Sequence, residues 1–257
     1  MNNIKISNPA FDYDEGGKKY SKIRRTDKRI AKLIFEVFEN KGTVLNIGAG
    51  AGSYEPEDRY VISVEPSKEM REQRLESGKN PAVNAKSDNL PFDDNSFNYS
   101  TAFLTIHHWI DLRKGLEEMK RVSKDKIIIM TYDPAKLELF WNVEYFRELI
   151  EVERARYPSI EIIKEILNLK CEEKPIPIPF DCEDGFQEAF YGRPEKFLDK
   201  EVRMSQSAWG FLSEEKEMEL VERLRIELDN GEWDRKYGHY RDEKFFNGAL
   251  RLLVFRK

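Results

Sequence analysis

The sequence predicts an α/β protein built on a doubly wound, mostly parallel β-sheet. Short apolar segments that suit buried strands alternate with longer segments in which apolar residues recur at helical spacing. One strand, residues 43–47, runs directly into the glycine-rich sequence Gly48-Ala49-Gly50-Ala51-Gly52. Because glycines let a ligand approach the backbone closely, this turn predicts a binding site at the carboxyl edge of the sheet.

The predicted elements follow one another in α/β order. Ile30 and Ile34 lie on one apolar stripe, which predicts an amphipathic helix over residues 27–40 with Thr26 or Asp27 as its cap. Strands are predicted at residues 43–47, 60–64, 82–85, 97–103 and 127–132, and helices at residues 67–75 and 112–122.

A different pattern follows Pro134. Residues 137–157 and 159–169 are predicted as helices rich in aromatic residues, which could roof the carboxyl edge of the sheet. Proline alternates with isoleucine over residues 175–179, which suits an edge strand or an extended connection. A helix at residues 213–230 and a last strand at residues 250–255 complete the chain.

Composition narrows the class of protein. The 257 residues suit one large domain with insertions, and the net charge of −5 lacks the basic surplus typical of nucleic-acid binding. Cys171 and Cys182 form no metal-binding motif, and no apolar segment reaches the length of a membrane span. We therefore expect a cytoplasmic protein without a metal site that binds neither nucleic acid nor a membrane.

An acid follows the second predicted strand. Glu65 can accept hydrogen bonds from both ribose hydroxyls of an adenosine-type cofactor. The glycine turn serves nicotinamide, flavin and S-adenosylmethionine sites alike, and NAD enzymes also have an acid at this place, so these residues leave the cofactor open.

The segment between the third and fourth predicted strands separates these cofactors. Ser87-Asp88-Asn89-Leu90-Pro91-Phe92, taken with the glycine turn and Glu65-Pro66-Ser67, resembles the class I S-adenosylmethionine-dependent methyltransferases, most closely their small-molecule, type 11-like branch. The resemblance implies a Rossmann-like sheet of seven strands, mostly parallel with an antiparallel last strand. It also implies S-adenosylmethionine as cofactor, S-adenosylhomocysteine as product and a small organic molecule as methyl acceptor.

The resemblance further implies a set of cofactor-binding residues. Asn46 and Lys86 stand where the family usually has acids, and Asn46 can still form a hydrogen bond to the loop backbone. The implied residues are Asn46, Gly48, Ala49, Gly50 and Gly52 for the loop, Glu65 for the ribose, Pro66, Ser87, Asp88 and Asn89 around the adenine, and Leu104 beside the transferred methyl group.

The resemblance extends to the second half of the chain. Asp184-Gly185-Phe186, Tyr191-Gly192-Arg193-Pro194-Glu195 and Gly231-Glu232-Trp233 are similar to an insertion found in a bacterial branch of the family. We expect one methyltransferase domain over residues 1–257. Its expected parts are an N-terminal cover (1–26), a cofactor-binding core (27–134), a helical lid (135–170) and an insertion before the last strand (183–247).

Four residues are candidates for acceptor chemistry or for further cofactor contacts. His107 or His108 could remove the acceptor's proton, and the alternative is that one histidine caps a helix while the other packs. Tyr20 and Arg24 belong to the cover, where an arginine could pair with the methionine carboxylate or remain in a solvated basic run. A methyltransferase is the favoured function, and the alternatives are a non-catalytic binder of the same cofactor or an NAD(P)-dependent oxidoreductase.

Overall fold

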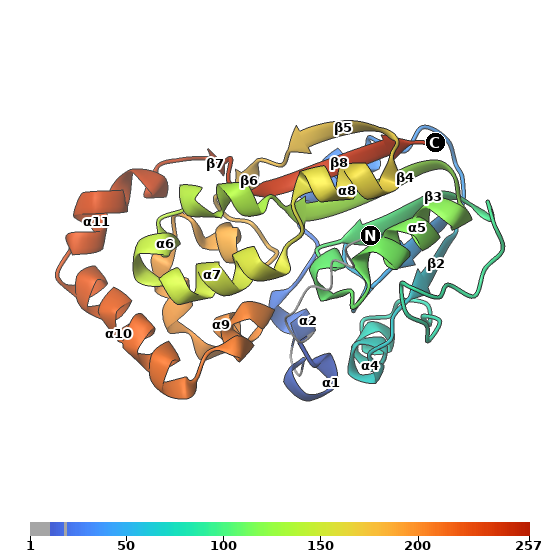
Figure 1. The fold of residues 1–257 in the computed structure, drawn as a ribbon. Helices are drawn as coiled ribbons and strands as arrows, with labels where there is room; N and C mark the ends of the chain where they lie inside the picture. The colour runs from blue at the N-terminus through green and yellow to red at the C-terminus, as the bar shows by residue number, and fades with distance from the viewer. Residues whose placement is uncertain (1–10, 18–19) are drawn as a thin grey trace.

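Six strands form the central sheet of the computed structural model, which describes residues 11–17 and 20–257 (Figure 1). In order across the sheet they are β2 (Val61–Val64), β1 (Val44–Ile47), β3 (Phe97–Phe103), β4 (Ser123–Tyr132), β8 (Leu250–Arg256) and β5 (Lys170–Pro175). The first four strands run parallel, and β8 is antiparallel to both of its neighbours. The predicted mostly parallel sheet with an antiparallel last strand is confirmed.

The prediction of a strand over residues 82–85 is wrong in its length. This segment forms one isolated bridge, between Val64 and Val83, so the sheet has six strands in the described part of the chain where seven were expected. Val83 is the only large apolar residue of the segment and is itself 37% exposed. The segment therefore buries too little apolar surface to extend the ladder.

Helices cover both faces of the sheet because side chains alternate along each strand. Ile128 of β4 packs in the same cluster as α3 (Lys28–Phe35), whereas its neighbour Ile129 packs in the cluster of α5 (Leu112–Val122) and α8 (Ile160–Leu167). Asp27, one of the two predicted caps, is the N-cap of α3. The helix ends at Phe35, before the predicted end at residue 40. Three more helices are α1 (Tyr13–Gly16), α2 (Tyr20–Ile23) and α4 (Lys68–Glu76).

The predicted helix over residues 137–157 is broken. It consists of a 3-10 helix, η2 (Pro134–Leu139), followed by α6 (Asn142–Tyr145) and α7 (Arg147–Arg156). Phe140 and Phe146, which mark the breaks, adopt non-helical backbone angles. Consecutive aromatic residues are fully buried here, and one continuous helix could not turn all of them toward the core.

A helical lobe lies beside the sheet (Figure 1). α6 and α7 form it with α9 (Lys200–Met204), α10 (Glu214–Asp229), α11 (Glu232–Tyr237) and the short pair β6 (Ile178–Pro179) and β7 (Phe245–Phe246). Aromatic rings fill its core, as where Trp141 meets Trp233 edge to face at 5.3 Å between centroids. The prediction that residues 135–170 form a lid is wrong for α8. This helix packs on the sheet with α5 and does not join the helical lobe.

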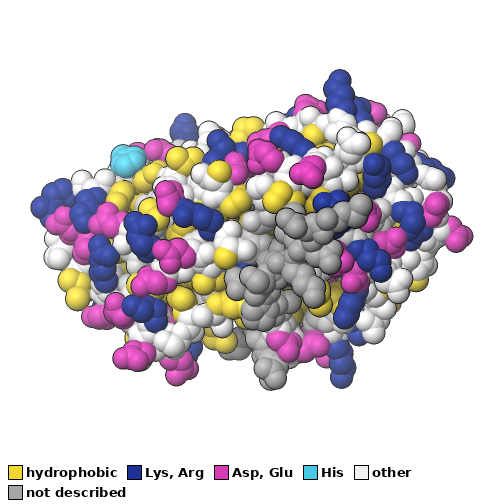
Figure 2. Space-filling model, viewed as in Figure 1, with side chains coloured by type: hydrophobic (Ala, Val, Ile, Leu, Met, Phe, Trp, Pro, Cys, Tyr) yellow, Lys and Arg dark blue, Asp and Glu magenta, His cyan; other side chains and the backbone are white. Residues whose placement is uncertain are grey.

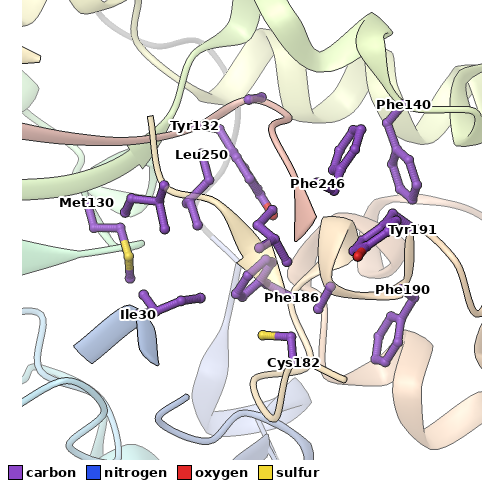
Figure 3. Close-up of a cluster of buried hydrophobic side chains, with 14 of the residues drawn as sticks. Ile30, Met130, Tyr132, Phe140, Cys182, Phe186, Phe190, Tyr191, Phe246 and Leu250 are labelled. Carbon is purple, nitrogen blue, oxygen red and sulfur yellow. The ribbon is translucent and has the colours of Figure 1, made fainter. Parts of the chain in front are cut away.

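The sheet and the lobe share one apolar core. Met130 and Leu250 of the sheet belong to the same cluster as Phe186 and Tyr191 of the insertion, and Figure 3 shows Phe186 lying between the sheet residues and Tyr191. The surface seen in Figure 2 carries interspersed basic and acidic side chains. No helix among residues 11–17 and 20–257 is long and apolar enough to span a membrane.

Candidate functional site

A cavity of about 310 Å³ opens at the carboxyl ends of the parallel strands. The turn after β1 and the segments after β2 and β3 line it, and the N-terminal cover closes it from the other side. Eleven of the predicted cofactor-binding residues line this cavity: Tyr20, Arg24, Asn46, Gly48, Ala49, Gly50, Glu65, Pro66, Ser87, Asp88 and Leu104. Gly52 and Asn89 do not line it.

The glycine turn serves two separate purposes. Gly48 and Gly50 both have positive φ, at 68° and 51°. A Cβ on Gly48 would meet the Thr105 hydroxyl at 2.1 Å, so packing requires glycine there. Gly50 lines the cavity and has open space where a Cβ would stand, so a glycine here leaves room for a ligand. Gly52 faces Arg74 instead, behind the turn.

Glu65 is tied to the glycine turn. Its two carboxylate oxygens accept hydrogen bonds from the backbone N–H groups of Gly50, at 2.8 Å, and Ser67, at 2.9 Å. Burial raises the pKa of Glu65 against the lowering effect of these bonds. Because a carboxylate offers about four acceptor positions, Glu65 can still accept from a ligand's hydroxyl groups.

Asn46 belongs to a buried polar network that the sequence did not predict. Its side-chain amide donates to Glu55 at 3.0 Å, and Ser63 donates to the same carboxylate at 2.7 Å. Arg74 binds Glu55 through two hydrogen bonds, at 2.9 and 2.8 Å. Burial would raise the pKa of Glu55, but the hydrogen bonds from Arg74, Asn46 and Ser63 hold it below its usual value. Glu55 thus supplies a carboxylate behind the turn where Asn46 carries none.

The N-terminal cover is attached at several points. Asp14 accepts hydrogen bonds from the Ser67 hydroxyl and from the backbone of Glu69, at the start of α4. Arg24 donates to Asp184 of the insertion at 2.6 Å, and Tyr54, just after the glycine turn, donates to the same carboxylate at 2.9 Å. Residues 1–10 and 18–19 of the predicted cover lie outside the described residues.

His108 links the cover to the helical lobe. Arg156 donates to its Nδ1 at 3.1 Å, and the Tyr13 hydroxyl lies 2.9 Å from its Nε2. Because a guanidinium can only donate, Nδ1 is the accepting nitrogen and the neutral ring carries its proton on Nε2. In this arrangement His108 has no free lone pair for an acceptor's proton.

His107 is turned away from the large cavity. It lines a second, smaller cavity and stacks on Tyr157 at 4.0 Å between centroids. Its buried Nδ1 has no hydrogen-bond partner within residues 11–17 and 20–257. A general-base role for either histidine stays a prediction.

His107 also makes stability depend on pH. Burial, together with His108 and Arg156, holds the pKa of His107 well below its usual value. Below about pH 6.5 the unfolded chain therefore binds a proton at this residue that the folded protein does not. Proton binding favours the unfolded chain, so the folded protein becomes less stable as pH falls. We expect the destabilisation by His107→Gln to be about 1.4 kcal/mol smaller at about pH 5.5 than at about pH 7.5. Urea unfolding measures this difference, and an equal penalty at both pH values would contradict it.

Fold and cavity together define the class. A mostly parallel sheet with an antiparallel last strand, a glycine turn after β1 and an acid after β2 are the features of a class I methyltransferase fold. A family model described as "Methyltransferase domain" matches residues 45–130. The resemblance to the class I S-adenosylmethionine-dependent methyltransferases is confirmed, with the family match covering residues 45–130.

Individual relatives agree with this assignment. The structure of a "putative methyltransferase from antibiotic biosynthesis pathway" of Anabaena variabilis ATCC 29413 superposes with a TM-score of 0.84 at 29% identity, covering 91% of this chain and 99% of that one. The uncharacterized methyltransferase YcgJ of Bacillus subtilis is 30% identical over 46% of this chain and 51% of its own length. The ubiquinone/menaquinone biosynthesis C-methyltransferase UbiE of Geobacter sp. is 30% identical over 41% of this chain and 52% of its own. The chain thus spans about half the length of these two curated relatives.

Proposed function

We propose that this protein transfers a methyl group from S-adenosylmethionine to oxygen, nitrogen or carbon of a small organic acceptor. The observation that carries the proposal is the cavity lined by Gly50, which has open space where a Cβ would stand, together with Glu65 and the segment after residue 85. We further propose that residues 1–257 form one methyltransferase domain. A cytoplasmic location is supported by two free cysteines, Cys171 and Cys182.

The lining residues suit this cofactor in shape and chemistry. The glycine turn would pass beneath its methionine part, Glu65 would accept from the ribose hydroxyls, and Ser87 and Asp88 would lie at the adenine. The cofactor supplies a methyl group already activated on a sulfonium. The chain therefore has to position the acceptor and exclude water, which the cover can do because Tyr13, Tyr20 and Arg24 line the cavity.

A pair of glycine variants tests the proposal. Gly50 and Gly78 both have positive φ and open space where a Cβ would stand, but only Gly50 lines the cavity. We expect both alanine variants to lose about 1 kcal/mol of stability and Gly50→Ala alone to lose S-adenosylhomocysteine affinity, by at least about tenfold. Calorimetric titration and urea unfolding measure the two effects.

The same titration separates the alternative functions. Failure of the unaltered protein to bind S-adenosylmethionine or S-adenosylhomocysteine at millimolar concentration would overturn the proposal. Preferential binding of NAD would favour an oxidoreductase. Tight binding of the sulfur ligands without turnover over a panel of acceptors would favour a non-catalytic binding protein.

A further inference from the structure

A second cavity, of about 30 Å³, lies next to the large one. Tyr13, Arg24 and Leu104 line both cavities and form the boundary between them. Leu104, at the end of β3, has a φ of 50°, a conformation that costs energy in residues other than glycine. The backbone is thus strained where the two cavities meet, as is typical of sites that position a ligand.

Among the described residues, four polar atoms that border the smaller cavity have no hydrogen-bond partner. Tyr132, Gln187, His107 and Glu153 line it, and each has a buried nitrogen or oxygen without a hydrogen bond: the Tyr132 hydroxyl, Gln187 Nε2, His107 Nδ1 and Glu153 Oε2. Buried polar atoms are almost always paired, so these four atoms around one cavity are available as hydrogen-bond partners for a bound polar group. The aromatic rings of Tyr157 and Phe186 complete the wall.

The unpaired atoms determine which hydrogen bonds a bound group would have to donate and accept. Gln187 Nε2 can only donate a hydrogen bond, the Glu153 carboxylate can only accept one, and the Tyr132 hydroxyl can do either. A hydroxyl group both donates and accepts, whereas a carboxylate only accepts and an ammonium only donates. A hydroxyl group is therefore the best match to the set.

The volume of the cavity sets the size of the group. A single water needs about 10–15 Å³ of such space, so this cavity holds a hydroxyl and the carbon that bears it. The remainder of the molecule has to lie beyond Leu104, in the large cavity. On the basis of the proposed methyl transfer, we propose that the smaller cavity receives the hydroxyl group of the acceptor and that Glu153 takes its proton.

The step balances without a further reactant. The hydroxyl proton passes to the Glu153 carboxylate while the hydroxyl oxygen forms a bond to the methyl carbon. The bond between that carbon and the sulfonium sulfur breaks, and its electron pair stays on sulfur as a neutral thioether. The products are a methyl ether, a protonated Glu153 and S-adenosylhomocysteine, and the proton is released to solvent when the products leave.

Glu153 is better suited to this role than the histidines. Burial raises the pKa of Glu153, although Arg156 and Arg24 lower it, so its carboxylate is a stronger base than usual. Arg156 Nη1 lies 3.7 Å from Oε2 without a hydrogen bond to it, and Arg24 lines the same cavity. Tyr13, Tyr132, Tyr157 and His107 are neutral titratable groups that line it as well. Burial lowers the pKa of His107, which makes it a weaker base.

The first test measures binding, with S-adenosylhomocysteine bound. Three probes share one ring: 4-methylphenol carries a hydroxyl, 4-methylbenzoate a carboxylate and 4-methylbenzylamine an ammonium. We expect NMR titration to show 4-methylphenol binding more tightly than the other two, and its affinity to fall about tenfold in Glu153→Gln. Glu151→Gln, an exposed change on the same helix, is the matched control and should leave the affinity unchanged.

The second test measures turnover with 4-methylphenol. We expect Glu153→Gln to lower kcat at least about a hundredfold and to remove the loss of rate toward acid pH, which Glu151→Gln should retain. Stronger binding of the amine or carboxylate probe, no binding of any probe, or an unchanged acid limb in Glu153→Gln would each overturn the inference. Unchanged S-adenosylhomocysteine affinity in Glu153→Gln shows that the variant is folded, whereas a failure of the unaltered protein to bind that ligand would overturn the proposed function instead.

Discussion

Replacing Asn46 with aspartate, the type of residue that the family usually has there, is expected to destabilise this protein by about 3 kcal/mol at neutral pH. The new carboxylate would face Glu55 at the position where the amide now donates a hydrogen bond of 3.0 Å. Both groups are buried, with Asn46 2% and Glu55 8% exposed, so solvent would screen their repulsion poorly. Urea unfolding at neutral pH measures the effect.

A second change identifies the cause of this destabilisation. In Asn46→Asp with Glu55→Gln, one carboxylate and one amide face each other again, so the double variant should be more stable than the sum of the single changes predicts. The penalty of Asn46→Asp alone should also shrink as pH falls through the acid range, because the added carboxyl becomes protonated. An additive double variant with a pH-independent penalty would refute the account.

The local elements of the site could be predicted from the sequence. The strand before the glycine turn, helix α5 and the place of Glu65 after β2 depend on apolar spacing and turn residues within short windows, and the structure confirms them. The cofactor contacts predicted for these residues stay predictions, since they concern a bound ligand.

The parts that the sequence did not predict depend on contacts between distant segments. Glu55 follows the glycine turn without any motif, and only the fold brings Arg74 of α4 to it. Glu153 lies within a segment predicted as plain helix, and its burial depends on residues from β4 and the insertion. The spacing of apolar residues within one segment carries no information about contacts with distant segments.

Asp184 should be the side chain whose loss most weakens the attachment of the cover. Its side chain is 1% exposed and pairs with Arg24 of the cover while accepting from Tyr54 beside the glycine turn. Asp184→Asn leaves the largely buried Arg24 without its counter-charge, so we expect a loss of about 3 kcal/mol in stability. Because Arg24 and Tyr54 line the large cavity, affinity for S-adenosylhomocysteine should fall about tenfold as well.

Asp181 provides the matched control for this change. It lies three residues earlier in the same insertion and pairs with Arg29 at 2.5 Å, but its side chain is 76% exposed. Water screens that pair, so Asp181→Asn should cost less than about 1 kcal/mol and leave ligand binding unchanged. Equal stability losses in the two variants would show that burial does not govern the strength of the Asp184 contact. A loss of stability in Asp184→Asn with unchanged ligand affinity would show that the pair holds the fold together without shaping the cavity.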